Sequence, residues 1–167
     1  VKALKLDVSV QKIYELSGID PWFLHRLKAI VEAEKELSDV GAMRESPKQQ
    51  LLHLKQLGFS DKKIGQITGN SEFEIRNLRI KNKIMPSVFQ IDTLAGEFPA
   101  KTNYLYTTYN GSHHDVKPIG DNGVMVLGSG PYRIGSSVEF DWTCVNSSLF
   151  LKKYGKKSII VNCNPET

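Results

Sequence analysis

The C-terminal part of the sequence restricts the possible folds most strongly. Val124–Leu127 is a short apolar run with strand preference, and the turn residues of Gly128–Pro131 end it. From Ser136 onward, apolar residues recur three or four positions apart, which predicts a helix that ends near Gly155. Ser158–Cys163 then predicts a second buried strand. A strand, a glycine-rich turn, a helix and a strand form a βαβ unit, which requires a parallel sheet.

This βαβ unit is too small to be a complete sheet. Two strands do not make a stable open sheet, so either the preceding residues add strands or the chain is part of a longer protein. The sequence opens without Met and stops directly after the second strand. We therefore expect an interior piece of a longer protein. The apolar stripe of its helix is expected to consist of Val138, Trp142, Val145, Leu149 and Leu151.

The N-terminal half repeats helix-start signals, each followed by apolar residues at helical spacing. These signals are Ser9, Asp20-Pro21, Ser46-Pro47, Ser60-Asp61 and a capping box at Ser71–Glu74. Gly18, Gly58 and Gly69 are the expected stops. The second helix places Trp22, Leu24 and Leu27 on its apolar stripe. Residues 8–83 therefore predict about five short amphipathic helices in a compact helical domain.

The pattern changes after Lys83. Met85-Pro86 prevents a helix, and the residues up to Ile91 are typical of extended chain. Asn103–Tyr109 alternates and is rich in aromatic and β-branched residues, which predicts a strand. Asn110–Gly123 predicts a polar loop or linker.

Composition excludes several classes of protein. The chain has 40% hydrophobic and 24% charged residues, as globular proteins do. No apolar run approaches the roughly 20 residues of a membrane span, and no signal peptide is visible. Cys144 and Cys163 fall on the expected helix and strand without metal-ligand spacing. We expect both to be buried free thiols in a reducing compartment.

Ser60–Lys83 could form a DNA-binding helix-turn-helix. Its second helix bears Arg76 and Arg79, and the net charge of +4 is carried entirely by residues 1–83. However, Glu72 and Glu74 would face phosphates at the start of that helix. A plain pair of packed helices with solvated charges is the competing interpretation.

Gly128, Gly130 and Gly135 suggest a ligand-binding loop without matching a nucleotide-binding motif. Arg133 stands where a dinucleotide fingerprint requires glycine, and no Gly-Lys-Ser/Thr follows. An anion site at the start of the next helix, with Arg133 nearby, remains open. His113-His114 with Asp115 is expected to be exposed and polar, with no metal bound.

Glu139 and Glu166 are the strongest candidates for chemistry. Glu139 lies early on the βαβ helix, and Glu166 follows the second strand. In a parallel sheet both would gather at the carboxyl edge, where such folds bind ligands. Helix-dipole stabilisation by Glu139 and a solvated loop at Glu166 explain the same pattern, and spacing leaves both interpretations open.

Several longer motifs resemble one family. GSGPYRIGSSVEFDW at 128–142 and VNCNPET at 161–167 are similar to the start of the second synthetase half of the carbamoyl-phosphate synthetase large subunit, in its eukaryotic form. SGIDPWFL at 17–24, GFSDKKI at 58–64, IDTLAGEF at 91–98 and TNYLYTTY at 102–109 resemble that subunit's oligomerisation domain and exit segment. The motifs occur in the same order and cover essentially the whole chain.

The resemblance implies a mainly α-helical oligomerisation domain (1–83), an extended exit segment and linker (84–122), and an incomplete α/β segment (123–167). That segment would be the first βαβ of a Rossmann-like pre-ATP-grasp domain. In this family, one half makes carbamate from bicarbonate, ammonia and ATP, and the other phosphorylates it with a second ATP. A tunnel carries the carbamate between the halves. The implied tunnel residues are Glu139, Glu166, Arg133 and Asn164, beside a loop with Gly128, Gly130 and Gly135.

The resemblance also sets expectations for cofactors and partners. The parent protein would use ATP with Mg or Mn, but this stretch would hold no cofactor, metal or catalytic residue. Expected partners are the remaining domains of the large chain, a glutaminase subunit or domain, and further copies in a homo-oligomer, without nucleic acid or membrane. The parent would serve arginine, urea or pyrimidine synthesis, with ammonia or glutamine as nitrogen source, in the cytoplasm or the mitochondrial matrix.

Overall fold

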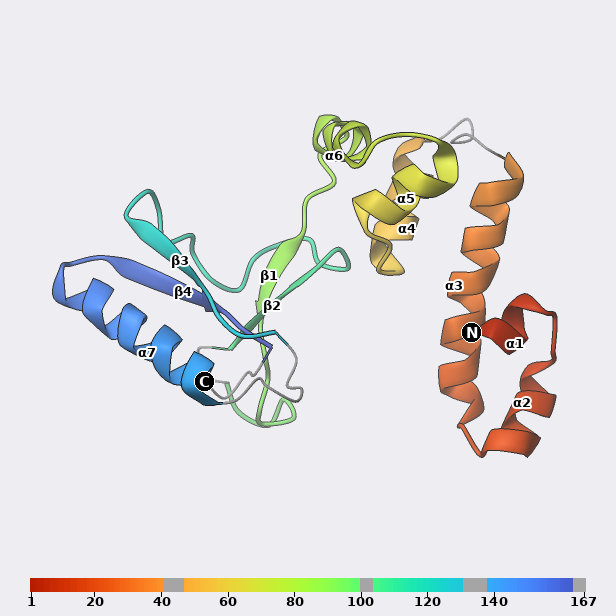
Figure 1. Ribbon diagram of the computed structural model, residues 1–167, viewed down its shortest axis with the longest axis horizontal. Coiled ribbons are helices and arrows are strands. Elements are labelled where there is room, and N and C mark those ends of the chain that lie inside the picture. Colours follow the sequence, from red (N-terminus) through yellow and green to blue (C-terminus); the bar gives the residue numbers. More distant parts are fainter. Residues whose placement is uncertain (41–46, 100–103, 131–137, 164–167) are drawn as a thin grey trace. The chain divides into compact units, whose positions relative to one another are not determined.

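The computed structural model describes residues 1–40, 47–99, 104–130 and 138–163 (Figure 1). It divides into two compact units. The helical unit comprises Val1–Ser87 with Thr108–Ser112, and the α/β unit comprises Val88–Thr107 with His113–Thr167.

Within the described residues, six helices belong to the helical unit. They are α1 (Lys2–Lys5), α2 (Val10–Ser17), α3 (Pro21–Val40), α4 (Pro47–Gln56), α5 (Asp61–Thr68) and α6 (Glu72–Lys81). The other elements are β1 (Ser87–Gln90), β2 (Leu105–Thr108), β3 (Gly123–Leu127), α7 (Val138–Lys153) and β4 (Lys157–Val161). The predicted order of a helical part followed by an α/β part is confirmed.

The helices begin and end where the local sequence predicts. Ser9 and Ser60 accept hydrogen bonds from the backbone N–H three residues on, and Ser71 forms a complete capping box with Glu74. The Asp20 side chain accepts the Trp22 N–H at 2.8 Å. Gly18 and Gly69 close α2 and α5 in the left-handed conformation. The short helix α1 was not predicted, because it has no capping side chain.

The core of the helical unit is aliphatic and lies among α3, α4, α5 and α6. Its buried members are Leu37, Leu51, Leu54, Phe59, Ile64, Ile75 and Ile84. Burial of each such side chain contributes roughly 1.5–3 kcal/mol to the free energy of folding. Trp22 is not among them, because it is 58% exposed and packs edge-to-face on Phe23. Its predicted place on the buried stripe of α3 is wrong, since Leu24 is the buried residue of that turn.

Two buried cations and a partly buried carboxylate lie together beside this core. The Asp61 carboxylate accepts hydrogen bonds from Lys55 Nζ at 2.7 Å and from Arg79 Nε at 3.1 Å. Lys55 and Arg79 are only 8% and 6% exposed. Each cation also donates to a backbone oxygen, Lys55 to that of Phe59 at 2.7 Å and Arg79 to that of Ile84 at 3.0 Å. One carboxylate therefore ties α4 and α6 to the first residue of α5.

An aromatic ring covers this charge cluster. The Tyr109 ring centroid lies 5.1 Å from Lys55 Nζ and 5.7 Å from Arg79 Cζ, within cation–π range. Burial raises the pKa of the Tyr109 hydroxyl, although the charge of Arg79 opposes the shift. Burial also acts to raise the pKa of Asp61, but the hydrogen bonds and charges of Lys55 and Arg79 outweigh it. The pKa of Asp61 therefore lies below its ordinary value.

A second ion cluster holds α1, α3 and α5 together. Glu34 of α3 contacts Lys5 Nζ and Lys63 Nζ, each at 2.7 Å. These hydrogen bonds lower the pKa of Glu34. Lys5 and Lys63 are half exposed, so the cluster contributes less than the buried one.

In the α/β unit, β1 and β2 form one two-stranded sheet. The polar segment His113–Asp115 binds β1. Val88 N–H donates to His114 Nδ1 and Gln90 N–H to an Asp115 carboxylate oxygen, each at 3.0 Å, while Asp115 N–H donates to the Val88 carbonyl at 2.9 Å. The histidines are exposed, as predicted. Within the described residues, no group of three His, Cys, Asp or Glu could hold a metal ion.

The elements β3, α7 and β4 form the predicted parallel βαβ arrangement, with α7 along one face of the two strands (Figure 1). The helix face that packs on the strands includes buried Cys144 and half-buried Val145, Ser148 and Leu151. Trp142 and Leu149 are 71% and 53% exposed, so their predicted place on the buried stripe is wrong. A single helix on two strands covers only one narrow face, and small side chains fill it.

The structure also tests the predictions about the two cysteines and about further strands in this sheet. Cys144 is buried, as predicted, but Cys163 is exposed, because β4 already ends at Val161. Both cysteines are free. No strand of the described residues before β3 joins the β3–β4 sheet. None of the helices described is both long and apolar enough to cross a membrane.

We expect Asp61→Ala to destabilise the helical unit by about 3–5 kcal/mol, because Lys55 and Arg79 would remain buried without a counter-charge. Hydrogen exchange of α5 and α6 amides, followed by mass spectrometry, reports the change locally. Asp39→Ala, an exposed aspartate of α3, is the control and should change protection by less than about 0.5 kcal/mol. Equal effects of the two variants would contradict the structural role of Asp61.

The lowered pKa of Asp61 also predicts an acid dependence of stability. Its contribution is complete above the unfolded-state pKa of about 3.9 and is lost as pH falls through the lower folded-state pKa. Asp61→Asn should therefore flatten the acid limb of a plot of unfolding free energy against pH. The carboxyl carbon of Asp61, followed by NMR, should titrate below the ordinary aspartate pKa of about 3.9; a midpoint at or above that value would contradict the charge cluster.

Candidate functional site

The candidate site lies at the carboxyl edge of the β3–β4 sheet. Leu127 and Val161, the last residues of the two strands, are register partners. Pairing continues beyond them, because Gly128 N–H donates to the Val161 carbonyl at 2.8 Å and Cys163 N–H to the Ser129 carbonyl at 3.2 Å. The segments that follow the two strands therefore start side by side. Parallel α/β sheets bind ligands at this edge.

Three polar side chains meet there, one from each element of the βαβ unit. Ser129 follows β3, Asp141 lies in the first turn of α7, and Asn162 follows β4. Ser129 Oγ donates to Asn162 Oδ1 at 2.9 Å, and Asn162 Nδ2 donates to Asp141 Oδ1 at 2.8 Å. Ser129 Oγ also lies 3.4 Å from Asp141 Oδ1. We call Ser129, Asp141 and Asn162 the edge cluster.

The backbone approaches this cluster closely at Gly128. A Cβ atom at this position would lie 3.0 Å from Asn162 Oδ1 and 3.1 Å from its Cγ. At Gly130 a Cβ atom would meet nothing within 4 Å. A side chain at position 128 would therefore contact Asn162 more tightly than ordinary van der Waals packing, whereas one at position 130 would have open space.

The structure describes only some of the predicted site residues. Glu139 lies in the first turn of α7 and is exposed, and its carbonyl accepts Thr143 Oγ at 2.7 Å. Gly128 and Gly130 follow β3. The remaining predicted residues, Arg133, Gly135, Asn164 and Glu166, lie outside the described residues. Their roles, and that of Glu139, stay predictions.

Sequence reasoning missed the edge cluster. Ser129 and Asp141 belong to the motif at 128–142, and Asn162 belongs to the motif at 161–167. None of the three has a residue type or spacing that by itself predicts a ligand or a catalytic group. Their separations of 12, 21 and 33 residues become contacts only when the strands pair in register. A polar residue within two positions of the end of each of two parallel strands was the available signal.

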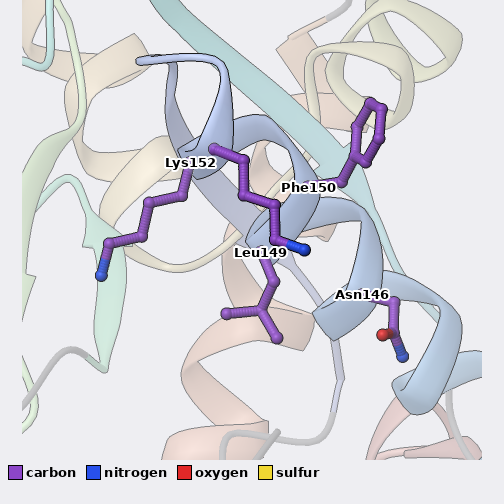
Figure 2. Close-up of a pocket in the computed structure, with 5 residues that line it drawn as sticks. Asn146, Leu149, Phe150 and Lys152 are labelled. Carbon is purple, nitrogen blue, oxygen red and sulfur yellow. The ribbon is translucent and has the colours of Figure 1, made fainter.

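A shallow depression elsewhere on α7 does not form a comparable site. Asn146, Leu149, Phe150, Lys152 and Lys153 line it. Figure 2 shows the Lys152 and Phe150 side chains leaving the helix on opposite sides. Its polar groups do not converge, and its residues are exposed or half exposed.

Helices α5 and α6 have the order of a helix-turn-helix, but their charged side chains are not arranged to contact DNA bases. Helices α5 and α6 pack across the turn, and a Cβ atom at Gly65 would lie 2.5 Å from the Asn70 carbonyl oxygen. Arg79, proposed as a groove contact, is buried against Asp61. Glu74 is engaged by Ser71 in the capping box. These contacts match the interpretation of two packed helices.

Comparison with known proteins gives one consistent result. The family profile for the carbamoyl-phosphate synthetase large chain, oligomerisation domain, matches residues 1–83. The profile for the carbamoyl phosphate synthase preATP-grasp domain matches residues 120–167. The chain belongs to the carbamoyl-phosphate synthetase large-chain family. The DNA-binding alternative is not supported.

Similar proteins extend this result over the whole chain. Identity is 52% to the mitochondrial carbamoyl-phosphate synthase (ammonia) of Aquarana catesbeiana, over 99% of this chain and 11% of that protein. It is 52% to the carbamoyl phosphate synthase arginine-specific large chain of Cutaneotrichosporon cutaneum, over 98% of this chain and 14% of that protein. It is 51% to the multifunctional protein CAD of Squalus acanthias, over 99% and 7%. The chain thus spans about a tenth of the length of these relatives.

We expect Gly128→Ala to destabilise the α/β unit by about 1–3 kcal/mol, because the new methyl group comes within 3.0 Å of Asn162 and forces this hydrogen-bonded side chain to shift. Hydrogen exchange of the β3 and β4 amides measures the change. Gly130→Ala is the matched control; its Cβ has open space, so we expect no loss and a gain of up to about 1 kcal/mol. If both variants exchanged alike, the close contact at Gly128 would be wrong.

Proposed function

We propose that this chain is a structural and assembly segment of a carbamoyl-phosphate synthetase. The helical unit would serve oligomerisation. The α/β unit would open the Rossmann-like pre-ATP-grasp domain of the second synthetase half. At its carboxyl edge, Glu139 would belong to the wall of the path along which carbamate travels, together with Arg133, Asn164 and Glu166.

The observation that carries this proposal is identity of about half of all residues along 99% of the chain, combined with two family profiles in succession. The geometry supports it chemically. Carbamate decomposes in water, so its path has to exclude bulk solvent. At the carboxyl edge, three polar side chains bind one another. Within the described residues, the edge holds no arrangement of nucleophile and base.

The proposal also covers cofactors, partners and compartment. The ATP sites, with Mg or Mn, would lie in other domains of the synthetase, and those domains would be the main partners of this chain. A glutaminase subunit or domain and further copies of the synthetase are the other proposed partners. The similar proteins include one named for ammonia, one named arginine-specific and one named multifunctional. We therefore propose arginine, urea or pyrimidine synthesis as the pathway, with ammonia or glutamine as the nitrogen source. Because two similar proteins are named mitochondrial, we propose the mitochondrial matrix or the cytoplasm.

A segment exchange tests this function. In the Aquarana catesbeiana synthase, the matching stretch would be replaced by this chain. We expect the chimera to form carbamoyl phosphate from bicarbonate, ammonia and ATP within about tenfold of the parent rate, equivalent to ~1.4 kcal/mol in the barrier. The isolated chain should form none. A deletion of the stretch is the control and should be inactive.

Two outcomes would contradict the proposal. A well-folded chimera without synthesis would show that the segment does not serve this reaction. Carbamoyl phosphate formation by the isolated chain would show that it is an enzyme in its own right rather than a structural segment.

A further inference from the structure

We propose that Asp141 is a positioning residue for the carbamate path. Through Ser129 and Asn162, it fixes the first turn of α7, and with it Glu139, against the carboxyl ends of β3 and β4. This inference rests on the proposed function. It adds a role for the edge cluster that the predicted tunnel residues do not include.

The hydrogen-bond directions make Asp141 the acceptor on which the cluster converges. An ionised carboxylate only accepts, so Asn162 must turn its amide nitrogen toward Asp141. That orientation leaves Asn162 Oδ1 as the acceptor for Ser129 Oγ. Ser129 is 9% exposed, and the acceptors within reach of its hydroxyl are Asn162 Oδ1 at 2.9 Å and Asp141 Oδ1 at 3.4 Å. A single carboxylate therefore orients both partner side chains.

The cluster also joins the first turn of α7 to the two strand ends. The two strand ends are joined by backbone hydrogen bonds at Gly128 and Cys163. The first turn of α7 is joined to both strand ends through Asp141. Glu139 precedes Asp141 by two residues in the same turn. The backbone position of Glu139, from which its side chain starts, thus follows the position of Asp141.

The chemistry of carbamate makes this position matter. In the intact path, carbamate reaches a second ATP, accepts the γ-phosphoryl group on a carboxylate oxygen and yields carbamoyl phosphate with ADP. If it escapes into water, carbamate and one water molecule give ammonia and bicarbonate. The ATP spent on making that carbamate is then lost. A displaced wall therefore raises the ADP formed per carbamoyl phosphate above two.

The test uses the full-length synthetase that contains this chain, with ADP and carbamoyl phosphate measured in the same reaction. We expect Asp141→Ala to raise the ADP-to-product ratio at least about twofold, since small misplacements have large effects on bound reactants. Asp141→Asn keeps the side-chain size and one acceptor oxygen, so its ratio should stay near that of the native enzyme. Ser129→Ala should raise the ratio in the same direction as Asp141→Ala. Ser147→Ala, an exposed serine of α7, is the matched control and should leave it unchanged.

A double variant tests whether the cluster acts as a unit. If Asp141 works through Asn162, Asp141→Ala with Asn162→Ala should raise the ratio no further than Asp141→Ala alone. Additive effects would overturn the proposal.

Other outcomes also separate the alternatives. Slower synthesis by Asp141→Ala at an unchanged ratio would mean that the residue only stabilises the fold, and would overturn the proposal. If Asp141→Asn raised the ADP-to-product ratio as much as Asp141→Ala, the charge of Asp141 rather than its hydrogen bonds would have the role. That result would also overturn the proposal. A native enzyme that forms no carbamoyl phosphate would refute the proposed function. A native enzyme with a ratio of two and unresponsive variants would refute only this inference.

Discussion

The arrangement of the helical unit depends on one partly buried carboxylate that pairs with two buried cations. Asp61 begins α5, and its two oxygens bind a lysine from α4 and an arginine from α6. An aliphatic core by itself accepts many packings of similar volume. A carboxylate with two buried cations accepts only the arrangement that keeps both of them paired, because leaving either unpaired costs several kcal/mol. The apolar core supplies most of the driving force, and Asp61 fixes how α4, α5 and α6 meet.

In the α/β unit, too, hydrogen bonds between polar side chains join separate elements, here at the carboxyl edge of the sheet. Ser129, Asp141 and Asn162 bind one another, so polar groups that the strand ends would otherwise bury are satisfied. The sheet itself is narrow, and α7 covers one face. On the other face, Met125, Leu127, Ile159 and Val161 remain exposed. Position at the strand ends, rather than burial beneath a large core, defines the candidate site.

Both units belong to the same family of proteins, the carbamoyl-phosphate synthetase large chains. Each matches a separate domain profile, and the relatives are about ten times longer than the chain. Under the proposed function, this segment holds surfaces in place for the other domains of the synthetase. The internal salt bridges of the helical unit and the hydrogen bonds of the edge cluster are the means by which this chain holds its surfaces.

The sequence by itself determined the local structure. Caps such as Ser9, Ser71 and Gly69, and the glycine-rich break after β3, act within a few residues, so their outcome can be predicted from spacing. Burial of charge could not be predicted this way. Arg79 meets Asp61 across 18 residues, and Ser129 meets Asn162 across 33. Sequence patterns suggested a solvated Arg79 and a buried Trp142, and both were wrong. Tertiary packing decided which polar groups were enclosed, because only the assembled helices and paired strands bring their partners within hydrogen-bonding distance.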